Sequence, residues 1–270
     1  MKFPKFNRTN GSSSKQLEKF LKRERNEDPN LSRRTILGDS YLRHIYSVLL
    51  NIMLDKVCMN ESQSQKIVEL GSAGGITAVV DERVITSDLR SAIGVQVVAD
   101  GCYLPFEDSS VDGMIAKDVL HHLPNPISHF REIARVLKPG CSIVYAEPNW
   151  NLFSKIIFTR LHPEPYEENQ NEWSRKSSDP MDANQALAKI IFVRDRSLFD
   201  KTFNNLNFEV CPPTYGLSYL LSGGVFNRTL IGSQPLKLLD KFETLTRGWL
   251  RIFGLNRIIV ITKKLNDACV

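Results

Sequence analysis

The sequence lacks any uninterrupted apolar run of the length that crosses a lipid bilayer, which takes about 20 residues. Its amino end also lacks the apolar core of a secretory signal, because residues 1–40 are polar and rich in Lys, Arg, Asn and Ser. These two absences predict a cytoplasmic protein without a membrane span. The chain can still bury a substantial core, since 42% of its 270 residues are hydrophobic.

Cysteine is also scarce, and the few cysteines lack the paired spacing of a disulfide framework or a zinc site. The five are Cys58, Cys102, Cys141, Cys211 and Cys269. We expect reduced thiols that pack in the interior. We also expect no bound metal, since the acids and histidines have places at predicted strand ends and no tight ligand cluster stands out.

Positive charge is concentrated at the amino end of the chain. The net charge is +5, and residues 1–40 hold ten Lys or Arg against five Asp or Glu. A basic segment can attract nucleic acid or anionic lipid. Because Glu18, Glu24 and Glu27 interrupt this one, we expect a solvated, flexible arm over 1–38 and no nucleic-acid partner. Residues 39–270 are expected to form one domain.

Three predicted strands carry an acid where they end. The first strand contains Glu69 and runs into a glycine-rich turn, while the next two end at Asp88 and Asp100. Ligands of parallel α/β sheets bind at the carboxyl ends of the strands, and glycines let the backbone approach them closely. A carboxylate about 20 residues beyond such a turn suits a ribose diol. The pattern predicts a nucleotide-cofactor site.

The glycine spacing disfavours a nicotinamide cofactor. The dinucleotide fingerprint G-x-G-x-x-G would require glycine at 71, 73 and 76, but the chain has Gly71, Ala73 and Ile76. The turn instead resembles the first motif of class I S-adenosylmethionine-dependent methyltransferases, acid-x-Gly-x-Gly-x-Gly. Glu69, Gly71 and Gly75 match it, and Ala73 replaces the usual central glycine.

The resemblance extends over residues 66–148. Residues 100–112 are similar to the more specific D-x-x-x-L-P-F-x-D-x-S-F-D segment of small-molecule methyltransferases. Residues 113–123 resemble the family's fourth strand and the loop behind it. Residues 130–140 resemble the helix and turn that precede the fifth strand.

This resemblance implies an α/β fold: a Rossmann-like, doubly wound, seven-stranded, mostly parallel sheet with helices on both faces. It implies S-adenosyl-L-methionine as the cofactor. In the family pattern Glu69 supports the loop and the methionine end, Asp88 holds the ribose, and Asp100 reads the adenine amino group. The cofactor-binding residues that it implies are Glu69, Gly71, Ala73, Gly75, Asp88, Leu89, Asp100, Gly101 and Asp118.

Two helices can be predicted from the residues themselves. Asn125 is a good N-cap, Pro126 suits the first helical position, and Gly140 lies just beyond the end of the helix. A second amphipathic helix over 39–57 precedes the first strand. It packs against the sheet edge in our first interpretation, and in the alternative it covers the cofactor through Tyr41 or Arg43.

Two long segments are expected to carry substrate-recognising insertions, 149–207 between the fifth and sixth strands and 212–256 between the sixth and seventh. The first contains a proline-braced turn with His162 and Glu164. The second has an apolar stripe at helical intervals, which we expect to pack in the core. Cover of the substrate pocket, a dimer face and a lipid contact are the alternatives. The stripe consists of Leu236, Leu239, Phe242, Leu245, Trp249, Ile252 and Phe253.

A hydroxyl acceptor would need a base to take its proton, and histidine suits neutral pH best. His122 is the first candidate because it follows the predicted fourth strand, in the loop expected to face the methyl group. His121 is its neighbour, and His162 is a rival from the first insertion. The alternative is that His122 only packs against or caps the next helix.

We therefore predict a methyltransferase that moves a methyl group to a small-molecule, sugar- or lipid-linked acceptor, at oxygen in preference to carbon or nitrogen. A catalytically silent methyltransferase-like domain that binds a partner or lipid through the apolar stripe is the second hypothesis. A nicotinamide-dependent oxidoreductase is the third. Peripheral membrane contact stays open, as does the oligomeric state.

Overall fold

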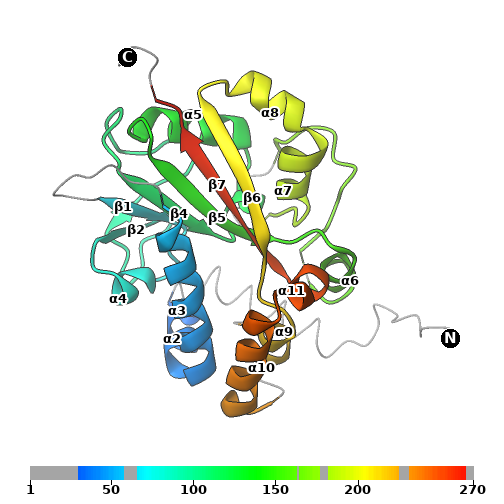
Figure 1. Cartoon of the computed structure of the whole chain (residues 1–270). Helices are drawn as coiled ribbons and strands as arrows, with labels where there is room; N and C mark the ends of the chain where they lie inside the picture. The colour runs from blue at the N-terminus through cyan, green and yellow to red at the C-terminus, as the bar shows by residue number, and fades with distance from the viewer. Residues whose placement is uncertain (1–29, 58–65, 163, 177–181, 225–230, 266–270) are drawn as a thin grey trace.

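A seven-stranded sheet in the order β3-β2-β1-β4-β5-β7-β6 forms the centre of the molecule (Figure 1). The strands β1 to β5 run parallel, whereas β7 is antiparallel to both of its neighbours. The computed structural model describes residues 30–57, 66–162, 164–176, 182–224 and 231–265. The strands are β1 Ile67–Leu70, β2 Val84–Asp88, β3 Val97–Val98, β4 Gly113–Lys117, β5 Ser142–Pro148, β6 Leu206–Thr214 and β7 Asn256–Lys263. The predicted α/β fold is confirmed.

Helices cover both faces of this sheet, as continuous apolar strands require. Strand β5 shows this directly, since Ile143 and Tyr145 pack into one core cluster and Val144 and Ala146 into the other. The first cluster joins the sheet to α5 (Pro126–Val136) and α8 (Arg196–Thr202). The second joins it to α2 (Leu31–Gly38) and α3 (Ser40–Asp55), on the opposite side in Figure 1.

The two helices predicted from the sequence begin at polar caps. The Asp39 carboxylate accepts hydrogen bonds from the Tyr41 and Leu42 amides, at 2.8 and 2.9 Å, where α3 starts. The Asn125 side chain accepts from the Ser128 amide at 3.1 Å, with Pro126 in the first turn of α5. Such caps satisfy amides that have no partner inside the helix. The buried face of α3 supports our packing interpretation of that helix.

The flexible arm predicted for residues 1–38 does not extend to residue 38. Residues 31–38 form α2, whose Ile36 is 2% exposed and packs in the second core cluster. The basic residues Arg33 and Arg34 suggested a solvated segment. They lie beside apolar residues that pack against the sheet, so this segment is part of the folded domain. Residues 1–29 lie outside the described part of the chain.

Both long insertions contain short helices. Between β5 and β6 lie α6 (Leu152–Arg160), α7 (Leu187–Lys189), a π-helical turn (Ile190–Arg194) and α8. Strand β6 runs to Thr214, so the second insertion starts later than residue 212. It comprises α9 (Leu217–Ser222), α10 (Ser233–Leu245) and α11 (Arg247–Phe253).

The predicted burial of the apolar stripe is wrong for most of its members. Leu236 is fully buried, but Phe242, Leu245 and Ile252 are 50%, 75% and 59% exposed. The buried residues of α10 are Leu236 and two acids, and the helix ends at Leu245 before α11 begins. The stripe therefore divides between two helices and turns outward.

Among the described residues, no helix combines the length and the apolar character needed to cross a bilayer. The longest helix in the described part of the chain, α3, has 16 residues.

Candidate cofactor and catalytic site

The turn after β1 has the left-handed backbone that a glycine-rich loop permits. Gly71, Gly74 and Gly75 have φ of +67°, +101° and +67°, and Ala73 also adopts a positive φ of +45°. The Ala73 amide donates to Asp88 Oδ2 at 3.0 Å. A methyl group at position 73 thus does not prevent the loop conformation, and the carboxylate at the end of β2 holds the loop in place.

Gly71→Ala should disrupt this loop and weaken cofactor binding by about tenfold or more. A Cβ at position 71 would overlap the Val119 Cγ2 methyl group, at a φ that side chains rarely adopt. Calorimetric titration with S-adenosylmethionine measures the effect, with Gly248→Ala as the control because nothing lies within 4 Å of a Cβ there. A folded Gly71→Ala protein with unchanged affinity would remove the loop from the binding site.

Glu69 offers a buried acceptor beside the loop. Its side chain is 6% exposed; Oε1 accepts from the Thr77 hydroxyl, and Oε2 has no partner among the described residues. Burial raises the pKa of Glu69 to about 8. The Ser72 hydroxyl is likewise buried without a partner. Unpaired buried polar atoms are costly, so these two fit a polar, ammonium-bearing group such as the methionine end of the predicted cofactor.

Helix α2 contributes a residue to the loop that sequence reasoning missed. The Arg33 guanidinium donates to the Gly74 carbonyl, and to the Gly75 carbonyl at 3.0 Å. Nearby, the Ile93 amide donates to the Asn30 side chain at 2.8 Å. These contacts span 40 or more residues of sequence, so no local motif could have indicated them.

The remaining predicted cofactor residues follow β2, β3 and β4. Leu89 is 47% exposed after β2, and Asp100 Oδ1 accepts from the Cys102 amide at 2.8 Å. The Gly101 carbonyl lies 2.7 Å from Nδ1 of the buried His129. Asp118 has a φ of +54° and pairs with Lys117 at the end of β4. The fold therefore brings all nine predicted residues to the carboxyl ends of four adjacent strands. Their contacts with a cofactor stay a prediction.

The three predicted histidines converge on one carboxylate, that of Glu164. Its oxygens lie 3.5 Å from His121 Nε2, 3.7 Å from His122 Nε2 and 3.8 Å from His162 Nδ1. Gln185 also donates to it. His121 and His122 lie in a 3₁₀ turn, Leu120–His122, just after β4, whereas the other groups come from the first insertion. The sequence showed Glu164 beside His162 but gave no sign of this convergence.

His121 is held from its other side by Glu147, at the end of β5. The His121 Nδ1–Glu147 Oε2 distance is 2.6 Å, and both side chains are buried. Glu147 Oε1 also accepts from the Val119 and Leu120 amides, at 3.0 and 2.8 Å. Sequence reasoning missed Glu147, although an acid at the end of the fifth strand repeats the pattern that identified the first three acids.

The two neighbouring histidines have pKa values shifted in opposite directions. Burial by itself would lower the pKa of His121, but Glu147 and Glu164 raise it to about 10. Burial and the charge of His121 lower the pKa of His122 to about 4. Near neutral pH His121 is therefore an imidazolium and His122 a neutral imidazole. The buried His122 Nδ1 has no partner among the described residues. A neutral histidine oriented by a carboxylate is the arrangement of a general base.

We expected no bound metal because no tight cluster of ligands stood out in the sequence. The structure shows such a cluster. One ligand atom each from His121, His122 and Glu164 lies within 4.8 Å of the others. Two imidazoles and a carboxylate form a ligand set that zinc accepts, and the Glu147 contact resembles the second-sphere carboxylate of many metal-bound histidines. The sequence did not indicate this cluster because Glu164 is 42 residues from His122.

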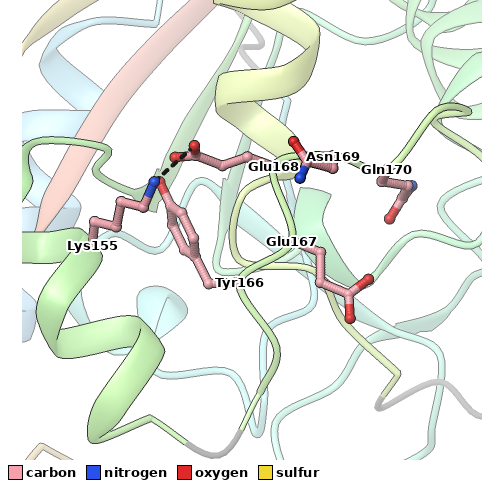
Figure 2. A pocket seen from close by; sticks show the side chains of 6 residues that line it. All are labelled: Lys155, Tyr166, Glu167, Glu168, Asn169 and Gln170. Atoms are coloured by element: carbon pink, nitrogen blue, oxygen red, sulfur yellow. Dashed lines mark hydrogen bonds and ion pairs between the residues drawn. The ribbon is translucent and has the colours of Figure 1, made fainter.

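A polar surface hollow of about 460 Å³ lies in the first insertion. Figure 2 shows Lys155 and Glu168 pointing toward each other across it, at 2.9 Å, with Tyr166 beside them. Lys189 pairs with the other Glu168 oxygen at 2.7 Å. The hollow contains none of the predicted catalytic residues, and its ion pairs tie α6 to the segment that carries Glu164.

Comparison with known proteins identifies a methyltransferase domain in the chain. Residues 68–145 match the family model described as a methyltransferase domain. The sterol 4-C-methyltransferase of Caenorhabditis elegans is 27% identical over 189 residues, 65% of this chain and 55% of that protein. The 27-O-demethylrifamycin SV methyltransferase of Amycolatopsis mediterranei is 37% identical over 79 residues, 29% of this chain and 25% of that protein. The chain thus spans between a quarter and about half of the length of these relatives.

A solved structure of an S-adenosylmethionine-dependent methyltransferase from Archaeoglobus fulgidus is similar at 15% identity, with a TM-score of 0.49. The match covers 91% of this chain and 99% of that one. The family match identifies residues 68–145 as a methyltransferase domain, and the seven-stranded, mostly parallel sheet agrees with the fold expected of class I S-adenosylmethionine-dependent enzymes. The resemblance noted in residues 66–148 is confirmed.

Proposed function

We propose that this protein transfers a methyl group from S-adenosylmethionine to a hydroxyl oxygen of a small-molecule, sugar- or lipid-linked acceptor. The observation that carries the proposal is the neutral His122 beside Glu164, next to the strand ends that hold the predicted cofactor residues. When bound, S-adenosylmethionine supplies a sulfonium methyl group that is already activated for transfer. The protein then has to place the acceptor oxygen in line and remove its proton.

His122 would take the hydroxyl proton as the oxygen forms its bond to carbon. Glu164 lies on the Nε2 side of the ring, so we assign the proton to Nε2 and the available lone pair to Nδ1. After transfer the proton resides on His122, and Glu164 stabilises the resulting imidazolium, as the acid of a catalytic triad does. His121 is already protonated and keeps Glu164 in position.

The oxygen preference rests on this base, because a hydroxyl needs one. The names of the two relatives point to oxygen in a rifamycin and to carbon in a sterol, so the family supports both. Carbon transfer to an alkene would need a proton to be removed only after the methyl group has been added. A neutral histidine beside a carboxylate, as His122 is beside Glu164, suits the hydroxyl better, since it can take the proton during the attack.

The first experiment is calorimetric titration with S-adenosylmethionine, S-adenosylhomocysteine and NADH in parallel. We expect binding of the two adenosyl ligands alone, followed by methyl transfer to hydroxylated sugar or lipid extracts. Binding without transfer to any acceptor would favour the silent-domain hypothesis. Binding of NADH alone would overturn the proposal.

Zinc should inhibit the enzyme, because Zn²⁺ binding to His121, His122 and Glu164 would occupy the imidazole that must act as the base. Added EDTA should leave the rate of metal-free enzyme unchanged. Both are measured with the acceptor that the screen identifies, and Mg²⁺ is the control because it prefers oxygen ligands. Loss of activity in EDTA, restored by Zn²⁺, would assign the cluster to a catalytic metal and contradict the base.

A further inference from the structure

Three helices of the two insertions present one apolar surface to the outside. Helices α6 and α11 meet through Phe153 and Phe253, whose rings are 5.1 Å apart. Trp249 packs on Phe253 at 4.5 Å, and Phe242 of α10 lies 6.2 Å from Trp249. In Figure 1 α11 lies between α6 and α10, with α10 at the lower end of the molecule. We call the exposed apolar side chains of these helices, together with Leu161 just after α6, the apolar face: Leu152, Ile156, Leu161, Leu238, Phe242, Leu245, Trp249 and Ile252.

The side chains of the apolar face are largely exposed to solvent. Leu152, Leu238 and Leu245 are 76%, 70% and 75% exposed. Single exposed leucines are ordinary, but a contiguous apolar patch marks an interaction site. Leu236 on the same helix is fully buried, so α10 packs on the core through Leu236 and not through its exposed leucines.

The charges on these helices are sorted by sign. The exposed charged residues among them are Arg160, Lys241 and Arg251, and Lys237 is half-buried; all four are basic. The two acids of the three helices are Asp240 and Glu243, and both are buried. Glu243 accepts from the Leu217 amide at 2.6 Å and from the Ser218 hydroxyl at 2.6 Å, which fixes α9. The outward surface is therefore apolar and positive, with its negative groups turned inward.

We propose that the apolar face docks the protein on an anionic lipid bilayer. Leucine, isoleucine and tryptophan side chains partition into the interfacial region, and lysine and arginine around them pair with lipid phosphates. A protein partner would need a matching acidic rim. A second copy of this chain would bring the same bases face to face across a two-fold axis, which costs free energy. An anionic lipid surface accommodates both the apolar side chains and the basic side chains of this surface, whichever acceptor the enzyme methylates.

Vesicle flotation of the full chain tests this docking. We expect binding to phosphatidylcholine vesicles that contain phosphatidylglycerol, and much weaker binding to phosphatidylcholine alone. Leu238→Ser with Leu245→Ser should reduce binding by about tenfold or more, because two inserted leucines are lost. Lys237→Glu with Lys241→Glu should reduce binding similarly and remove most of its salt dependence.

The control is Leu198→Ser with Leu265→Ser, which removes two leucines of 53% and 72% exposure outside the apolar face. It should leave vesicle binding unchanged. Affinity for S-adenosylmethionine should be the same in all three double variants, which separates docking from the cofactor site. The proposal is overturned if the chain does not float with anionic vesicles, or if the two leucine pairs behave alike. It is also overturned if light scattering shows a dimer that only Leu238→Ser with Leu245→Ser dissociates.

Discussion

His122→Ala is expected to lower kcat by about 10²–10⁴-fold, the usual contribution of a general base, with little change in affinity for S-adenosylmethionine. The reason is that His122 is the neutral member of the pair, while His121 is held as an imidazolium between Glu147 and Glu164. Steady-state rates with the identified acceptor, together with calorimetric titration of the cofactor, measure the two quantities separately.

Two further variants show whether His122 acts as a base or only packs. Glu164→Gln removes the charge that faces His122 at 3.7 Å and should lower kcat by roughly 10–100-fold, through loss of imidazolium stabilisation. His44→Ala is the matched control, since His44 contacts Asp240 at 3.3 Å and belongs to neither predicted site. Turnover of His122→Ala equal to that of His44→Ala would return His122 to a packing role.

The pH profile supplies an independent check on the same base. The folded-state pKa of His122 is lowered to about 4, below the ordinary value of 6.5, so the lone pair is available over a wide range. We expect kcat to stay level from pH 8 to about pH 5 and to fall only as the pH approaches 4. A fall centred near 6.5 would show that the base is a histidine in an ordinary environment.

The sequence predicted that the residues assigned to the cofactor lie together at one edge of the sheet, because each of them belongs to a local pattern. An acid followed by a glycine turn, as at Glu69 and Gly71, reports the end of a strand within a few residues. In a parallel sheet such ends meet at one edge, so their proximity follows from the fold. Ala73 replaces the usual central glycine but still adopts a positive φ, and its amide donates to Asp88.

The catalytic half could be predicted only in part. The sequence identified His121, His122 and His162 as candidates, but their meeting on Glu164 depends on how the first insertion folds back. That path is set by tertiary contacts, such as the Asn184 amide donating to the His121 carbonyl at 3.0 Å. Arg33 was missed for the same reason, because its contact with the glycine loop is visible only after α2 packs on the sheet.

Asp88→Ala should weaken S-adenosylmethionine binding by about 1–3 kcal/mol, or roughly 5- to 150-fold, if its carboxylate holds the ribose hydroxyls. The structure adds a second reason for a loss. Asp88 Oδ2 accepts from the Ala73 amide at 3.0 Å and Oδ1 from the Arg90 amide at 3.1 Å. Removing the side chain would therefore also loosen the empty loop and lower the melting temperature.

Asp88→Asn separates these two contributions, because an amide oxygen can still accept from the Ala73 amide while the charge is lost. If Asp88 binds the ribose, Asn should retain most of the stability of the empty protein and lose most of the affinity that Ala loses. Asp200→Ala, which removes a half-exposed carboxylate on α8, should change neither quantity. Full affinity in Asp88→Asn would mean that Asp88 only shapes the loop, and the ribose would then have to be held by the backbone of residues 71–75. The melting curve and the titration of one variant thus distinguish a binding residue from a structural one.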